Sequence, residues 1–214
     1  MVTVWGLLAV SMTAAALLCW ALLPKPVPAG GTVDALSGTP ALQTIIWPRE
    51  MAPGRAWRFI IIHHSAAAAA PAKASAPGRP EGPSEDGVPY HFIIHRAAGP
   101  ADGQVTATQQ WIEQLDGASG RPTDRPDLGG DGIHICLVGD FDHQKPTARQ
   151  MTSLQLLVMS LRDRYNIPLE LIVGHSEINN THCPGMLFPM EAFLMDVREA
   201  YLMKRIRGGS GEAP

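Results

Sequence analysis

The chain has 214 residues, of which 45% are apolar and 17% are charged, against roughly 25% charged residues in an average soluble domain. The net charge of −3, without a dense run of lysine and arginine, excludes the electrostatic footprint of a nucleic-acid-binding protein. Long apolar periodic segments exclude a wholly disordered chain. The length suits one domain with a substantial hydrophobic core.

Residues 1–24 form an N-terminal hydrophobic segment that has no charged residue between Val4 and Leu23. A run of this length can cross the hydrocarbon core of a bilayer, and it suits a buried helix of the fold less well. We expect a secretory signal or a membrane anchor, with cleavage left open. The protein is therefore expected to be exported to the cell envelope, whether periplasmic, membrane-anchored or secreted.

The next segments separate a linker from the first strands. Prolines are frequent in residues 25–56, which we expect to be a linker and lead-in to the domain. Residues 57–63 and 90–96 are short apolar runs that are typical of buried strands. Between them, residues 66–89 are rich in alanine, proline and glycine, and the prolines predict a mobile loop rather than a helix.

Three further strands are predicted over residues 105–111, 133–139 and 169–173, of which the second is expected to be central. Residues 117–132 are polar and rich in glycine, and they are expected to form a loop. Strands and helices interleave along the chain. The predicted class is therefore α/β, with a single domain over residues 57–206 and a flexible tail over 207–214.

Two amphipathic helices are predicted in the second half of the chain. Thr147 begins the first, with Gln150 three residues later completing a capping box, and Asn166 and Pro168 mark its end. The apolar stripes of the two helices are Met151, Leu154, Leu157, Val158 and Leu161, and Met190, Phe193, Leu194 and Val197.

Candidate metal ligands follow two of the predicted strands. His63 and His64 come at the end of the first strand, and His175, His182 and Cys183 lie in the loop after the fifth. Imidazole and thiolate are preferred zinc ligands, and three protein ligands leave one position for water. Because strand side chains alternate, only one of His63 and His64 is expected to face a shared ion. Of the adjacent His182 and Cys183, one can likewise be a bystander.

The other histidines and cysteines have simpler interpretations. His91 and His95 share a strand face, and we expect both to be hydrogen-bonded at the sheet surface rather than to bind metal. His134 either lines the site or is a core histidine whose ring nitrogens are hydrogen-bonded, and both interpretations stay open. Only Cys136 and Cys183 lie outside the leader, which is too few for a disulfide framework in an exported domain.

Four sequence motifs occur in a familiar order: FIIIHHSA at 59–66, YHFIIHR at 90–96, GIHICLVGDF at 132–141, and GHSE at 174–177 followed by THCPG at 181–185. Together they resemble the zinc-dependent N-acetylmuramoyl-L-alanine amidases of type 2. That family includes bacteriophage amidase-type lysozymes and animal peptidoglycan recognition proteins. The resemblance covers roughly residues 57–201 and implies a mixed central β-sheet flanked by helices.

By position in these motifs, the resemblance implies that His63, His175 and Cys183 bind Zn²⁺. It also implies that Tyr90 is the active-site tyrosine and that Thr181 occupies a position where catalytic recognition proteins carry threonine. Such an enzyme hydrolyses the amide between N-acetylmuramic acid and L-alanine in peptidoglycan. Zinc with the hydroxyl of Thr181, joined by the phenol of Tyr90, is then expected to stabilise the oxyanion.

The sequence leaves some roles open and departs from the family pattern in two segments. Glu177 can act as general base or orient His175, and neither role is assigned. Segment 66–89 replaces an amphipathic helix of the family, and Gly117 is not followed by the histidine of a Gly-x-His motif. The alternatives to a peptidoglycan amidase are a non-catalytic peptidoglycan-binding module and a zinc amidase acting on soluble muropeptides. The retained Cys183 favours catalysis, because loss of this ligand is the usual sign of the binding module.

Overall fold

The computed structural model describes residues 32–34, 39–48, 51–52, 54–66, 89–117, 124–128 and 130–209. The leader at 1–24 and the segment 67–88 lie outside the described residues, and so do the expectations stated for them. Among the helices that are described, none combines the length and apolar character needed to cross a membrane.

A six-stranded mixed sheet forms the centre of the fold, in the order β1-β4-β3-β5-β2-β6. Its strands are β1 (Thr32–Asp34), β2 (Phe59–His64), β3 (Phe92–Ile94), β4 (Gln104–Ala107), β5 (Gly132–Leu137) and β6 (Ile172–Gly174). Strands β3, β5, β2 and β6 run parallel, whereas β4 is antiparallel to both of its neighbours. The sheet confirms the predicted α/β class.

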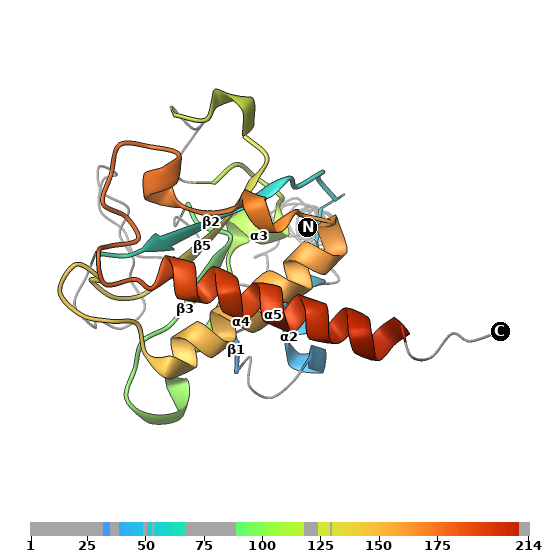
Figure 1. Ribbon diagram of the computed structural model, residues 1–214, viewed down its shortest axis with the longest axis horizontal. Helices are drawn as coiled ribbons and strands as arrows, with labels where there is room; N and C mark the ends of the chain where they lie inside the picture. Colours follow the sequence, from blue (N-terminus) through green and yellow to red (C-terminus); the bar gives the residue numbers. More distant parts are fainter. Residues whose placement is uncertain are drawn as a thin grey trace, which may run out of the picture.

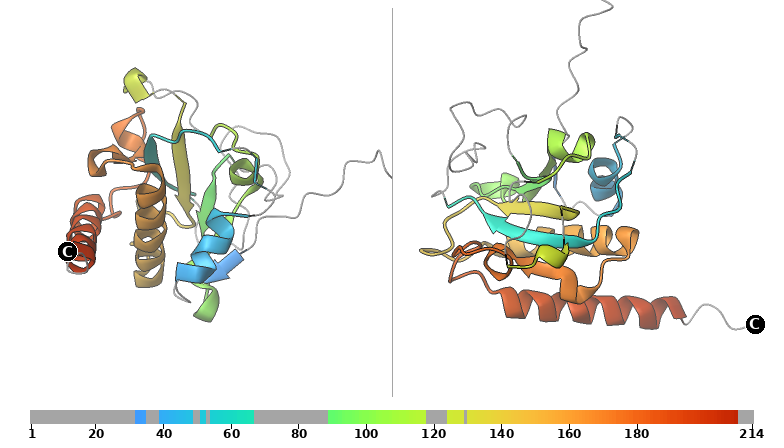
Figure 2. Two further views of the ribbon diagram at one scale, coloured as in Figure 1. Left: turned by 90° about the vertical axis from the view of Figure 1, so that its right-hand side faces the viewer. Right: turned by 90° about the horizontal axis from the view of Figure 1, so that it is seen from above.

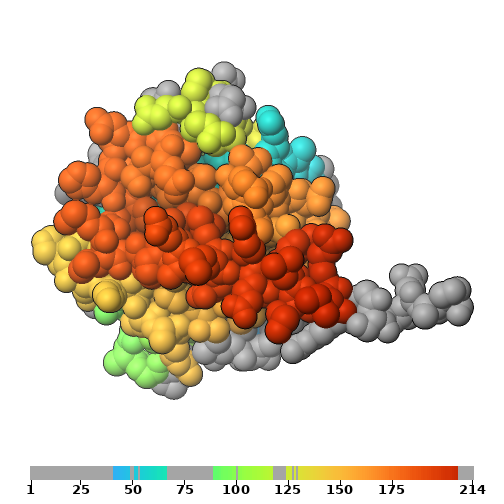
Figure 3. All heavy atoms as spheres, in the orientation of Figure 1, coloured from blue at the N-terminus to red at the C-terminus, as the bar shows by residue number. Residues whose placement is uncertain are grey.

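The helices lie mainly on one face of this sheet. They are α2 (Thr39–Ile46), α3 (Gln109–Ile112), α4 (Ala148–Tyr165) and α5 (Met190–Gly209). Helix α4 packs against the sheet, and α5 lies outside α4, as the two perpendicular views show (Figures 1 and 2). In the space-filling view α5 runs across the front of the molecule (Figure 3). Phe193 and Val197 turn inward from α5 and join the main core.

The ends of α4 are set by local interactions that the sequence predicts correctly. The Thr147 side chain accepts a hydrogen bond from the backbone N–H of Gln150 at 3.0 Å, and the Gln150 side chain accepts from the backbone N–H of Thr147 at 3.1 Å. At the other end Asn166 adopts the left-handed conformation, with φ at 53°. Both devices satisfy backbone groups that a helix leaves unpaired at its ends.

Two strand predictions need correction. The strand expected over residues 105–111 ends at Ala107, and the short helix α3 follows it. The turn places Trp111 in the core, where its Nε1–H donates to the carbonyl of Ile46 at 3.1 Å. The strand expected over 169–173 is instead a 3₁₀ turn over Leu169–Leu171 followed by β6. In the first segment, the packing of Trp111 in the core overrides the local strand pattern. In the second, the strand is short because β6 lies at the edge of the sheet and pairs only with β2.

The expected linker over residues 25–56 also needs correction, because it contributes two elements to the fold. Strand β1 pairs with β4, and Leu42, Ile45 and Ile46 of α2 are buried in the main core. Pro40 does not break α2, because it lies in the first turn of the helix, where the missing N–H would have no helical partner.

Each of the parallel strands separates two apolar layers. Ile60 and Ile62 of β2 face the large core beneath the helices, whereas Phe59 and Ile61 face a smaller cluster on the opposite side. Parallel strands that are buried on both faces appear in the sequence as continuous apolar runs. His63 continues the second series, so it points to the face opposite α4.

His91 is a fully buried titratable group in this fold. Its ring lies against Trp57 with centroids 4.7 Å apart and is also close to Trp111. Its Nδ1 accepts from the backbone N–H of His134 at 2.8 Å, which leaves Nε2–H to donate to the carbonyl of Leu115 at 2.8 Å. Burial lowers the pKa of His91 to about 4. The expected hydrogen-bonded role is therefore observed.

Stability should fall on acidification because of His91. Below the ordinary pKa of 6.5 the unfolded chain binds a proton at His91, whereas the folded ring stays neutral down to about 4. We expect this group alone to cost about 2 kcal/mol of the free energy of unfolding at pH 5. In urea titrations, the His91→Gln variant should lose less stability than wild type between pH 7 and pH 5 by this amount. Equal losses in the two proteins would contradict the prediction.

Candidate metal centre

The parallel pairing of β2 with β6 brings two histidines together. Ile62 is opposite Gly174 in the ladder, so the next residues, His63 and His175, lie at the same carboxyl edge of the sheet. Their ring centroids are 4.5 Å apart. Binding sites of parallel sheets commonly form at this edge, where strands end and loops begin.

The loop after β6 returns to place Cys183 beside these rings. The backbone N–H of Ser176 donates to the carbonyl of Cys183 at 2.7 Å, which closes the loop. Gly185 has φ at +104°, and a Cβ there would lie 2.5 Å from the carbonyl carbon of Phe141. Glycine is required at this close approach, which seats the loop against the segment after β5.

The side chains of His63, His175 and Cys183 form a cluster that suits a metal ion. Each offers one ligand atom, and the three atoms lie within 4.8 Å of one another. Cys183 Sγ is 3.7 Å from His63 Nδ1. Tetrahedral zinc with ordinary bond lengths separates a sulfur and a nitrogen ligand by about 3.6 Å. The donor set and the spacing therefore fit zinc, whose fourth coordination position three protein ligands leave to water or substrate.

The electrostatic environment keeps these groups uncharged. Burial lowers the pKa of His63 well below its ordinary value, and burial together with the nearby His64 lowers the pKa of His175. Burial raises the pKa of Cys183 to about 12, opposed by a hydrogen bond from the backbone N–H of His64. Neutral imidazole is the form that binds metal, and a bound cation would favour the thiolate.

The sequence neighbours of two cluster residues point away from the cluster. The ring of His64 turns to the segment after β5, where its Nδ1 accepts from the backbone N–H of Phe141 at 3.2 Å. His182 is exposed. The cluster therefore includes His63 and Cys183 rather than His64 and His182.

Tyr90 and Thr181 both lie beside the cluster. The ring centroid of Tyr90 is 5.1 Å from that of His63. Burial raises the pKa of Tyr90, so the phenol stays protonated. Thr181 Oγ1 accepts from the backbone N–H of Cys183 at 3.2 Å, which leaves the hydroxyl proton available for a further partner.

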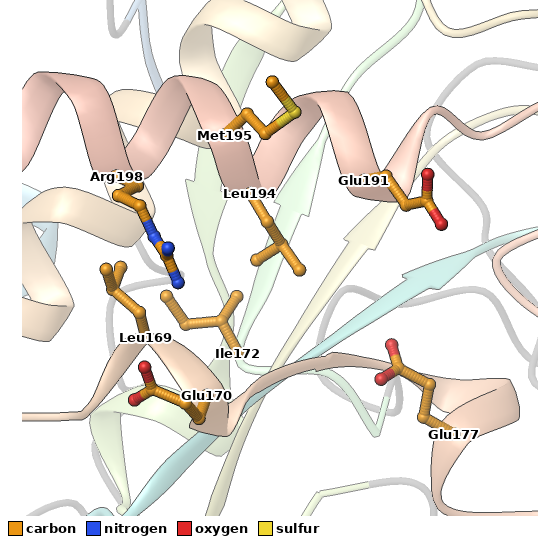
Figure 4. A pocket seen from close by; sticks show the side chains of 8 residues that line it. All are labelled: Leu169, Glu170, Ile172, Glu177, Glu191, Leu194, Met195 and Arg198. Carbon is orange, nitrogen blue, oxygen red and sulfur yellow. The ribbon is translucent and has the colours of Figure 1, made fainter.

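The structure separates Glu177 from the cluster and reveals a polar neighbour that the sequence did not indicate. Oε1 of Glu177 accepts from the backbone N–H of Gly174 at 2.7 Å. Its carboxylate points toward α5 in a groove of about 560 Å³ (Figure 4), and none of the three cluster residues is among the residues that line this groove. Asn179 Nδ2 instead lies 3.0 Å from His175 Nε2. No sequence signal marks Asn179, because only the turn after β6 brings it back to the ring.

The remaining histidines take different places. His95 Nε2 lies 2.7 Å from Thr106 Oγ1, so it is hydrogen-bonded between strands as expected. His134 is 2% exposed, and its Nδ1 lies 3.0 Å from His63 Nε2. Of the two readings that the sequence left open for His134, the structure therefore favours the one beside the site.

Comparison with known proteins identifies the family. The chain belongs to the N-acetylmuramoyl-L-alanine amidase family, whose match covers residues 53–186. The match spans β2 to the loop that carries Cys183, and it bears out the resemblance seen in the sequence. No curated protein matches this chain.

Solved structures of similar fold include amidases and recognition proteins. The endolysin N-acetylmuramoyl-L-alanine amidase LysCS from Clostridium intestinale is 23% identical, with a TM-score of 0.51 over 66% of this chain and 84% of that chain. AmpDh3 from Pseudomonas aeruginosa, solved with anhydromuramic pentapeptide, is 20% identical, with a TM-score of 0.49 over 76% of this chain and 71% of that chain. At this identity the likeness to the endolysin establishes the fold.

Zinc content tests the cluster directly. The purified full chain should bind one equivalent of zinc, measured by elemental mass spectrometry after removal of free metal. Cys183→Ala should reduce the bound zinc to a small fraction, because two ligands remain. His182→Ala is the matched control, since this exposed neighbour lies outside the cluster, and it should keep the full equivalent. Equal zinc loss in the two variants would contradict the assignment.

Proposed function

We propose that this protein is a zinc-dependent amidase that hydrolyses the bond between N-acetylmuramic acid and L-alanine in peptidoglycan. The observation that carries the proposal is the cluster of His63, His175 and Cys183 at the carboxyl edge of the sheet. The chain's membership of the N-acetylmuramoyl-L-alanine amidase family supports the choice of this amide bond as the one that is hydrolysed.

The three cluster residues are proposed to hold the metal. Zinc bound there would lower the pKa of a coordinated water to about 7 and polarise the substrate carbonyl. The backbone N–H of His64 donates to Cys183 Sγ at 3.4 Å and would stabilise the thiolate form of this ligand.

Tyr90 and Thr181 are proposed to act on the carbonyl oxygen of the substrate. The Tyr90 phenol stays protonated, so it can donate a hydrogen bond to a substrate oxygen. The Thr181 hydroxyl is held by the backbone N–H of Cys183 and can donate its own proton. Donors placed in this way stabilise negative charge that develops during amide hydrolysis.

We propose a division into a leader at 1–24, a lead-in at 25–56 that is partly folded, an amidase domain that begins at 57 and continues to the end of α5 at Gly209, and a tail after it. The packing of β1 and α2 on the core adds part of the lead-in to the folded unit. The apolar leader would deliver the domain to the cell envelope, where peptidoglycan lies, and would hold it at the membrane if it is not cleaved.

Product analysis tests the proposed activity. The purified full chain, loaded with zinc, is incubated with purified peptidoglycan and, separately, with soluble muropeptides. We expect release of stem peptides that begin with L-alanine, identified by mass spectrometry. Removal of zinc by a chelator and the Cys183→Ala substitution should each abolish release, whereas His182→Ala should retain it.

Two outcomes would redirect the proposal. Tight binding of peptidoglycan without release of peptides would overturn catalysis and favour a binding module. Turnover of soluble muropeptides without turnover of the polymer would keep the amidase chemistry and change the substrate.

Substitution of Thr181 tests the proposed oxyanion donor. Thr181→Val removes the hydroxyl, and we expect kcat to fall by about 10²–10³-fold, the usual cost of losing one such donor. Thr181→Ser retains the hydroxyl and should stay within a few-fold of wild type. Zinc content should be the same in both variants. A valine variant with full kcat would show that the hydroxyl serves only to hold the loop.

A further inference from the structure

A second imidazole lies directly behind the ligand His63. His134 Nδ1 is 3.0 Å from His63 Nε2, and the two ring planes are inclined by only 18° with centroids 5.1 Å apart. With a short N···N distance and a centroid separation of this size, the rings meet edge to edge, as in a hydrogen bond, rather than face to face. Both side chains are buried, so water does not compete for this contact.

The direction of the bond follows from the position of the cluster. His63 Nδ1 faces Cys183 Sγ at 3.7 Å, so Nδ1 is the nitrogen that is available to a metal. A neutral imidazole that binds metal through one nitrogen carries its proton on the other. The Nε2–H of His63 must then donate to His134 Nδ1, and His134 carries its own proton on Nε2.

The surrounding backbone holds His134 in place. Its backbone N–H donates to His91 Nδ1 at 2.8 Å, and His91 is itself anchored to the carbonyl of Leu115 at 2.8 Å. Gly117 packs directly on the ring, since a Cβ at this position would lie 1.9 Å from His134 Cδ2. The acceptor that faces His63 is therefore fixed before any ligand binds.

We propose that His134 is a positioning residue that selects the tautomer of His63 and fixes the orientation of its ring for zinc. This inference rests on the proposed zinc site. The partners of metal-bound histidines are usually carboxylates, backbone carbonyls or water, and their loss costs about 10–100-fold in metal affinity or activity. Here a neutral imidazole on β5 takes that place, and it adds no negative charge to the buried cluster.

Zinc affinity of the full chain, measured by competition with a chromophoric chelator, tests the proposal. His134→Leu has a similar volume without an acceptor, and it should weaken zinc binding by about 10–100-fold. His134→Asn offers Oδ1 near the place of Nδ1, and it should recover most of the affinity. The free energy of unfolding of the metal-free proteins is measured in parallel. A leucine variant that is as stable as wild type without metal but binds zinc weakly would separate positioning from a structural role.

A second measurement needs no substitution. In long-range ¹H–¹⁵N spectra of zinc-loaded wild type, His134 should appear as the Nε2–H tautomer and His63 should be protonated at Nε2. His134 protonated at Nδ1 would overturn the proposal, as would zinc affinity within twofold of wild type in His134→Leu, or equal loss in the leucine and asparagine variants. Failure of wild type to bind zinc would overturn the proposed function as well, so the two failures are distinguishable.

Discussion

The register between β2 and β6 is the constraint on which the site depends. Pairing of Ile62 with Gly174 puts His63 and His175 at one edge of the sheet, and the loop after β6 then returns Cys183 to them. Because strand side chains alternate between the two buried faces of β2, a slip by one residue would move His63 out of the cluster to the helix side. The apolar packing of the strand therefore specifies the position of the ligand.

Burial also decides the charge of the cluster. Desolvation lowers the histidine pKa values and raises that of Cys183, so the groups that meet there are neutral. Neutral side chains do not repel one another when no metal is bound, and their nitrogen and sulfur atoms can bind a cation. The same desolvation keeps the Tyr90 phenol protonated, which suits a hydrogen-bond donor. One physical effect thus prepares both the proposed metal ligands and the proposed donor.

Local signals predicted the parts of the fold that local interactions determine. Thr147 and Gln150 cap α4 through contacts within four residues, and this prediction is confirmed. The errors lie where distant residues decide. Trp111 belongs to a short helix because the core accepts it there, and α2 forms within the expected linker because Leu42, Ile45 and Ile46 are buried in the main core. The role of His134 could not be predicted, because its contact with His63 joins two strands that are far apart in the chain. Asn179 is only four residues from His175, but the irregular turn that brings them together has no sequence pattern that marks it.

The sequence by itself determined the class of the fold, the family resemblance and the residue types of the cluster, because apolar runs and ordered motifs are properties of the chain. Alternation along a strand also determined that His63 and His64 must face opposite ways. Only the tertiary structure decided that His63, Cys183 and His175 meet, that Glu177 lies in a separate groove, and that His134 stands behind a ligand. Those facts depend on strand order and register, which arise when the buried faces of distant segments pack together.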